Sequence, residues 1–125
     1  MKLQNAQYKI DDKSILNYYE IPANKPNLLL LHAQGTNSLS YMNVVKRLSK
    51  YYHIYMVDYY GHGKSSHNKE KYNLISIGND IIDFIENVIG DEVSVVGHSS
   101  GGLIAAYIAA NCERCEKLFL EDPPF

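Results

Sequence analysis

Ser99 lies within residues 97–101, GHSSG, where one glycine stands two positions before the serine and another two positions after it. Residues 93–96, VSVV, have the pattern of a short buried strand, and residues 103–110, LIAAYIAA, are typical of a helix that packs closely on a sheet. A serine between such a strand and such a helix lies on a sharp turn, where glycines avoid steric conflict and the hydroxyl is exposed. The first N–H groups of the helix could bind a negatively charged oxygen. These features predict a serine nucleophile for acyl transfer.

The elements that must position Ser99 alternate along the chain between strand and helix. Two short strands are expected within residues 8–20, joined by a polar turn at 11–13. The strands expected after them are 28–31, 54–57, 93–96 and 118–120, and the expected helices are 41–50, 73–89 and 103–110, the second of them ended by Gly90. The four leucines at 28–31 are typical of a strand covered on both faces. This alternation predicts an α/β fold, with a mostly parallel sheet and helices on both of its faces.

Three polar, glycine-containing segments follow successive predicted strands. They are residues 32–35 (HAQG), residues 58–65 (DYYGHGKS) and residues 97–101. In order and spacing they resemble the motifs of the α/β-hydrolase superfamily, and the resemblance extends over residues 28–125. It implies that residues 1–125 form a single, incomplete domain, the N-terminal portion of an α/β-hydrolase fold, without the later strands, the cap and the catalytic histidine.

The resemblance also implies roles for individual residues. Ser99 corresponds to the nucleophile, and the backbone N–H groups of Gln34 and Ser100 correspond to the donors of the oxyanion hole. Glu121 or Asp122 corresponds to the triad acid in those relatives that carry it after this strand, although Asp122 before two prolines could also simply begin a turn. Asp58 is expected to be structural, with its carboxylate bound to loop amides, and Ser65 is expected to cap the same loop.

The histidine that should activate the serine is missing from the expected place. A serine hydroxyl becomes a strong nucleophile when a histidine removes its proton, and in this superfamily that histidine follows the serine in the chain. All five histidines, His32, His53, His62, His67 and His98, precede Ser99 or directly adjoin it on that side. His32, His53 and His98 are expected to pack or to form hydrogen bonds. A rearranged triad with His62 or His67 is the less favoured alternative.

These observations favour a serine hydrolase that acts on a small-molecule ester, thioester or amide through an acyl-enzyme on Ser99, with little activity alone. Two alternatives stay open. The chain could be a noncatalytic binding or assembly protein derived from a hydrolase, self-associating through its open sheet edge. It could also be one half of a split enzyme that a separate C-terminal chain complements.

The overall composition excludes several other classes. A net charge of −2 provides no basic field for nucleic acid, and the apolar runs are too short for a membrane span. The N-terminus lacks the apolar core of a secretion signal, so we expect a cytoplasmic protein. Cys112 and Cys115 have no second ligand pair, and they follow the predicted helix, whereas redox pairs precede one. No metal or cofactor is therefore expected.

Overall fold

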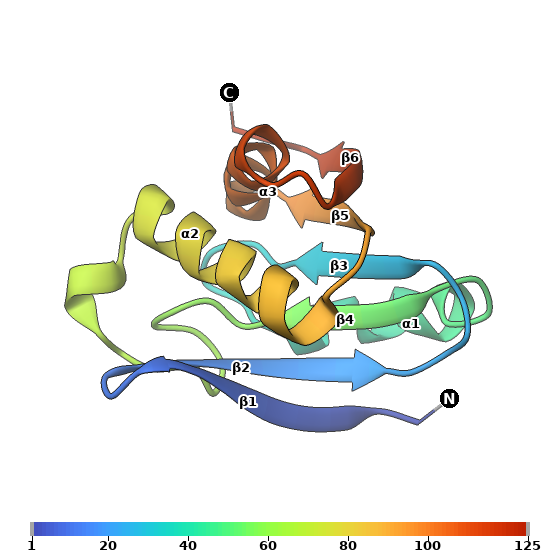
Figure 1. The fold of residues 1–125 in the computed structure, drawn as a ribbon, viewed down its shortest axis with the longest axis horizontal. Coiled ribbons are helices and arrows are strands. Elements are labelled where there is room, and N and C mark those ends of the chain that lie inside the picture. Colours follow the sequence, from blue (N-terminus) through green and yellow to red (C-terminus); the bar gives the residue numbers. More distant parts are fainter. Residues whose placement is uncertain (1, 125) are drawn as a thin grey trace.

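A six-stranded sheet runs through the computed structural model, which describes residues 2–124 (Figure 1). Its strands are β1 (Gln4–Asp11), β2 (Ser14–Ile21), β3 (Asn27–Leu31), β4 (His53–Val57), β5 (Val93–His98) and β6 (Cys115–Glu121). Their order across the sheet is β1-β2-β4-β3-β5-β6. Strand β3 pairs in parallel with β4 and β5, and β5 with β6, whereas β2 pairs antiparallel with β1 and β4. The expected mostly parallel sheet is confirmed.

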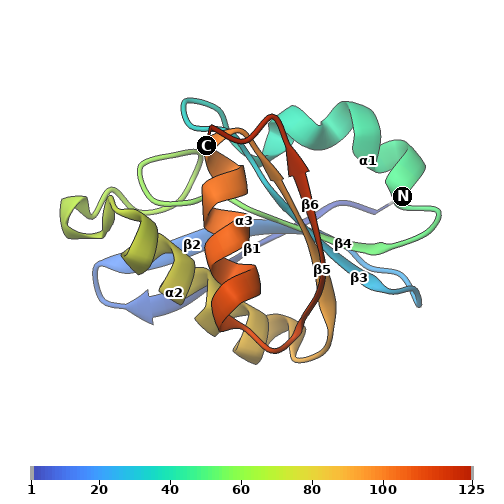
Figure 2. The same ribbon diagram turned by 90° about the horizontal axis from the view of Figure 1, so that it is seen from above.

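Helices cover both faces of this sheet (Figure 2). The helix α1 (Met42–Leu48), which follows the 3-10 turn η1 (Ser38–Tyr41), packs on one face through the buried Val45. The helices α2 (Leu74–Phe84) and α3 (Ser100–Asn111) pack on the opposite face. Alternate leucines of β3 serve the two cores, because Leu28 and Leu30 face α1 while Leu29 and Leu31 face α2 and α3. Fully burying each such side chain contributes about 1.5–3 kcal/mol.

All three helices differ in their bounds from the sequence prediction, and α1, expected over 41–50, ends at Leu48. The helix expected over 73–89 begins after Asn73, whose side chain accepts the Ser76 N–H at 2.9 Å, and its last five residues form a wider π-helical turn, η3 (Ile85–Ile89). Gly90 then ends the helix with a left-handed φ of 65°. The helix expected over 103–110 begins earlier, at Ser100. Glycine has a low helix propensity, so Gly101 and Gly102 gave no helical signal for this first turn.

Strand β6 forms one edge of the sheet, next to α3 (Figures 1 and 2). Its side chains Leu118, Phe119 and Leu120 are 37%, 48% and 37% exposed. An edge strand with exposed apolar side chains offers unpaired backbone groups to another polypeptide. Across residues 2–124, every helix is too short or too polar to serve as a membrane-spanning segment.

Candidate functional site

The three polar segments meet at the carboxyl end of the parallel strands, as the sequence predicts. Leu31 at the end of β3 pairs with Val57 of β4 and with Gly97 of β5. The residues that follow these strands therefore emerge side by side. In open α/β sheets, ligands bind at this carboxyl end of the strands.

Ser99 occupies the turn between β5 and α3. Its φ of 53° and ψ of −117° are uncommon for a residue with a side chain and cost about 1–3 kcal/mol. The surrounding hydrogen bonds hold this conformation, because the Ser99 N–H donates to the Glu121 carbonyl at 2.8 Å and the Ser99 carbonyl accepts the Gly102 N–H at 2.8 Å. The sharp turn expected at this position is confirmed, and the side chain is half-buried.

The glycines around Ser99 are required by close backbone contacts. A Cβ atom on Gly97 would lie 2.3 Å from the Gly101 carbonyl oxygen, and one on Gly101 would lie 2.5 Å from the Leu31 oxygen and 2.6 Å from the His32 oxygen. The first turn of α3 thus lies directly against the end of β3. Only residues without a side chain allow this approach.

We expect Gly101→Ala to lower the free energy of unfolding by about 1–3 kcal/mol, because the new methyl group must push α3 away from β3. Urea unfolding followed by circular dichroism measures this change. Gly102→Ala is the matched control on the same helix turn, since its Cβ would meet Pro123 Cβ at 3.3 Å and the nearest backbone atom at 3.5 Å. Equal losses in the two variants would contradict the backbone clash.

Gln34 and Ser100 come together at the start of α3. The backbone N–H of Gln34 donates to the Ser100 hydroxyl oxygen at 2.6 Å. The N-terminus of α3, a twelve-residue helix, carries a partial positive charge beside this contact. Two of the predicted site residues are therefore neighbours in space although they lie 66 positions apart in the chain.

A cleft of about 400 Å³ opens beside this pair. Gln34, His62, Asn73 and Ser100 are polar residues of its lining, which also includes Gly61 and a set of aromatic and aliphatic side chains. These other side chains are Tyr59, Tyr60, Tyr72, Leu74, Ile77, Leu103 and Ile104. Nothing in their type or spacing along the sequence indicates this role, although Tyr59 and Tyr60 directly follow Asp58 in the second polar segment. The cleft could hold an apolar group next to the Gln34 N–H.

His32 is a buried packing residue, as expected. Its ring stacks on Tyr59 with centroids 3.9 Å apart, and Nδ1 donates to the Ala33 carbonyl at 2.8 Å. Burial lowers the pKa of His32 below its ordinary value. The Tyr59 hydroxyl donates to the His32 carbonyl, and burial raises the pKa of Tyr59 to about 12. Both side chains are therefore neutral at pH 7.

Asp58 has the structural role expected of it. The fully buried carboxylate accepts the Ser38 N–H at 2.8 Å, the Lys64 N–H at 3.1 Å and the Asn17 side-chain amide at 3.0 Å. Ser65 caps the same loop, because its hydroxyl donates to the Asp58 carbonyl and accepts the Asn17 N–H at 2.7 Å. These bonds connect the loops after β3 and β4 to β2.

Comparison with known proteins identifies the family. Residues 26–125 match the family model described as the alpha/beta hydrolase fold. This chain belongs to the α/β-hydrolase family. It is 33% identical over 123 residues to a Haemophilus influenzae protein that carries an esterase/lipase name, covering 94% of this chain and 42% of that protein. It is also 32% identical over 96 residues to a pimeloyl-[acyl-carrier protein] methyl ester esterase of Vibrio campbellii, covering 74% and 35%.

Solved structures agree with this assignment. A bacterial membrane phospholipase A described as a virulence factor superposes with a TM-score of 0.89 at 27% identity, over 97% of this α/β-hydrolase chain and 40% of that protein. A hydrolase of Pseudomonas aeruginosa gives the same TM-score at 25% identity, over 95% and 46%. The chain thus spans less than half the length of the relatives it matches.

The two acidic candidates lie beyond the cleft of this α/β-hydrolase chain. Glu121 lines a separate groove of about 480 Å³ between α1 and the sheet, together with Tyr41 and Phe119. Burial, and next the charge of Glu121, raises the pKa of Tyr41. Asp122 follows with a left-handed φ of 52° and is exposed. Neither side chain is among those that line the cleft beside Ser100. A role of either as triad acid stays a prediction.

The remaining histidines and cysteines lie in other settings. His53 pairs with Glu20 at 2.5 Å and with the Ala23 carbonyl, as expected for a hydrogen-bonding residue, and His67 lies 3.5 Å from the Tyr72 hydroxyl. Both ring nitrogens of His62 bond to backbone groups, so neither can accept the Ser99 proton in this arrangement. Cys112 and Cys115 are free thiols that are not joined by a disulfide. Within residues 2–124, no group of three or more His, Cys, Asp or Glu could hold a metal ion.

Proposed function

We propose that this chain supplies the nucleophile-bearing part of a serine hydrolase that acts on esters, thioesters or amides through an acyl-enzyme on Ser99. The observation that carries the proposal is the left-handed turn at Ser99, which a residue with a side chain adopts only where surrounding contacts enforce it. Two esterase names among the relatives support the same chemistry. The chain covers only 42% and 35% of the length of those two proteins. The activity of the whole enzyme is therefore proposed here and is not given by the relatives' names.

The reaction follows from the arrangement at the start of α3. Ser99 Oγ attacks the acyl carbon, its proton passes to a base, and the carbonyl oxygen becomes an oxyanion. The N–H groups of Gln34 and Ser100 donate to this oxyanion. The alcohol, thiol or amine then leaves with a proton, and water releases the acid from Ser99. The apolar cleft of Tyr59, Leu103 and Ile104 accommodates the acyl chain or the leaving group.

In this proposal the general base that accepts the Ser99 proton lies outside these 125 residues, because no histidine follows Ser99 within them. A general base contributes about 10²- to 10⁴-fold to such a reaction. The chain alone is therefore expected to acylate Ser99 slowly and to turn over feebly. The test is whether an activated ester leaves a covalent acyl group on Ser99, measured by the mass of the intact protein.

A second candidate function is assembly with another polypeptide. Three exposed apolar side chains on the edge strand β6 favour it. The same experiment separates the two candidates, because an assembly protein without catalytic function has no reason to acylate Ser99 faster than any other serine. A complementing chain that docks on β6 and supplies the histidine would combine the two functions.

The Ser100 hydroxyl competes with substrate for the Gln34 N–H in this scheme. The contact of 2.6 Å must open before Gln34 can donate to an oxyanion. We expect Ser100→Ala to speed the acylation of Ser99 by about two- to tenfold, the worth of one net hydrogen bond. A time course of adduct formation by mass spectrometry measures this change. Slower acylation in Ser100→Ala would show that the hydroxyl helps to hold the donor in place.

A further inference from the structure

His62 joins the loop after β4 to the loop after β3. The Gly35 N–H donates to His62 Nε2 at 3.0 Å, and His62 Nδ1 lies 3.0 Å from the Tyr60 carbonyl oxygen. A carbonyl oxygen only accepts, so Nδ1 carries the proton and Nε2 carries the lone pair. The two partners therefore select the neutral imidazole with its hydrogen on Nδ1.

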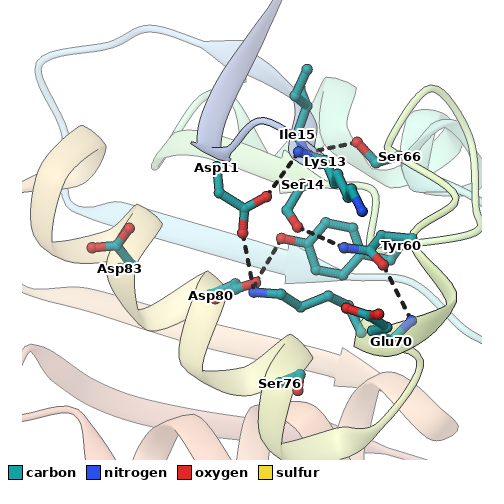
Figure 3. A network of polar contacts seen from close by, with 12 residues as sticks. Asp11, Lys13, Ser14, Ile15, Tyr60, Ser66, Glu70, Ser76, Asp80 and Asp83 are labelled. Atoms are coloured by element: carbon teal, nitrogen blue, oxygen red, sulfur yellow. Dashed lines mark hydrogen bonds and ion pairs between the residues drawn. The ribbon is translucent and has the colours of Figure 1, made fainter.

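The carbonyl that orients His62 belongs to a firmly anchored residue. Tyr60 is 1% exposed, and its hydroxyl donates to Asp80 Oδ2 at 2.7 Å (Figure 3). Lys71 Nζ lies 2.8 Å from the same carboxylate and 3.8 Å from Asp11 at the end of β1. Burial raises the pKa of Tyr60, so its hydroxyl remains a donor. The anchored Tyr60 carbonyl thus orients the His62 ring, and the ring in turn binds the Gly35 N–H.

We infer that His62 is a positioning residue of the loop that carries Gln34, and that protonation of its ring releases Gly35 from it. An imidazolium has an N–H on both nitrogens and cannot accept from Gly35. The ring and the Gly35 amide would then direct two donors at each other. The Gln34 N–H, one residue away, would keep its bond to the Ser100 hydroxyl but lose the neighbouring anchor at Gly35. The consequence for catalysis rests on the proposed function, whereas the release of Gly35 does not.

Several ionisable groups surround His62. The His32 ring, from the end of β3, lies 5.3 Å away between centroids, and the Tyr59 ring lies 5.1 Å away. Burial lowers the pKa of His32 and raises that of Tyr59 to about 12, so burial favours the neutral form of both side chains. Tyr72 lines the same cleft, and Asp58 and Lys64 belong to the same loop, where the Lys64 N–H is bound by Asp58. The contact therefore depends on the protonation state of the His62 ring itself: it is present when the ring is neutral and lost when the ring is protonated.

Nuclear magnetic resonance of the 125-residue chain tests this inference without substrate. We expect the ring nitrogens of His62 to show the Nδ1–H form at pH 8. On acidification the Gly35 amide signal should shift with the same midpoint as the His62 ring. Its hydrogen-exchange protection should fall by about two- to tenfold on acidification. A Gly35 amide that does not titrate, or a His62 ring in the Nε2–H form, would overturn the inference.

Three variants sharpen the test. His62→Gln places an amide oxygen near the position of Nε2, so Gly35 should stay protected down to pH 5 without titrating. His62→Phe keeps a ring but has no acceptor, so the protection should be low at every pH. His67→Gln, in the same segment, should leave the Gly35 titration unchanged, because His67 contacts the Tyr72 hydroxyl instead. Should His62→Phe fail to fold, the wild-type titration and His62→Gln still decide. A chain that shows this titration but never acylates Ser99 would refute the proposed function alone.

Discussion

Replacing Ser99 by alanine is expected to remove the acyl adduct that p-nitrophenyl acetate leaves on this chain. Without a histidine base, Ser99 differs from an ordinary serine mainly through the donors around it. One oxyanion donor is worth about 10²- to 10³-fold in rate. We therefore expect Ser99→Ala to lower the rate of adduct formation by about that factor, to the background of the other nucleophiles. Mass spectrometry of the intact protein and of its peptides measures the rate and locates the adduct.

Added imidazole should accelerate the reaction of the unchanged chain. It can take the Ser99 proton while Oγ bonds to the acetyl carbon and p-nitrophenolate leaves with the electron pair of the broken bond. The rate of adduct formation should rise in proportion to the imidazole concentration in the unchanged chain but not in Ser99→Ala. This dependence follows from the proposal that the general base lies outside these residues.

Ser40→Ala is the matched control, because Ser40 is an exposed serine outside the turn between β5 and α3. Its adduct rate should equal that of the unchanged chain. Two results would count against the proposal. An adduct that persists in Ser99→Ala would place the nucleophile elsewhere, and fast turnover that needs Ser99 but no imidazole would show that a base within the chain had been missed.

Local sequence patterns predicted the elements and the turn at the site. The apolar run at 28–31, the three- and four-residue steps of 73–89 and the glycines around Ser99 each report a constraint that acts within a few residues. The strand, the left-handed serine and the helix after it follow from such constraints. The parallel pairing of β3, β4 and β5 follows from their alternation with helices. This pairing brings the three polar segments together at the carboxyl end of these strands.

Contacts between distant segments could not be predicted in this way. The bond from Gln34 to Ser100 spans 66 positions, and that from Gly35 to His62 spans 27. Each depends on the angle at which a loop leaves its strand, which tertiary packing determines. The π-helical turn of η3 likewise has no periodic signal, because its apolar residues continue the pattern of α2. The tyrosines of the cleft are ordinary core-forming residues until the fold places them beside Ser100.

The buried carboxylate of Asp58 should have the largest effect on stability. Asp58 is fully buried, and Asp58→Ala leaves three donors, the Ser38 N–H, the Lys64 N–H and the Asn17 amide, without their acceptor. An unsatisfied buried donor costs about 1–3 kcal/mol. We expect a loss of about 3–5 kcal/mol in the free energy of unfolding, which is a large part of the stability of an ordinary domain. Urea unfolding followed by circular dichroism measures it.

Asp58→Asn distinguishes hydrogen bonding from the mere presence of a side chain. An asparagine keeps one acceptor for Ser38, but its NH₂ group faces the donors of Lys64 and Asn17, so we expect a smaller loss of about 1–3 kcal/mol. Asp12→Ala is the control for removing a negative charge, because the Asp12 side chain is 95% exposed in its pair with Lys9 and should have no measurable effect. If Asp58→Ala unfolds the chain outright, the asparagine variant still tests the argument. Equal stability of Asp58→Asn and the unchanged chain would mean that the loops after β3 and β4 are held by packing, since the amide bonds to Asp58 would then contribute nothing.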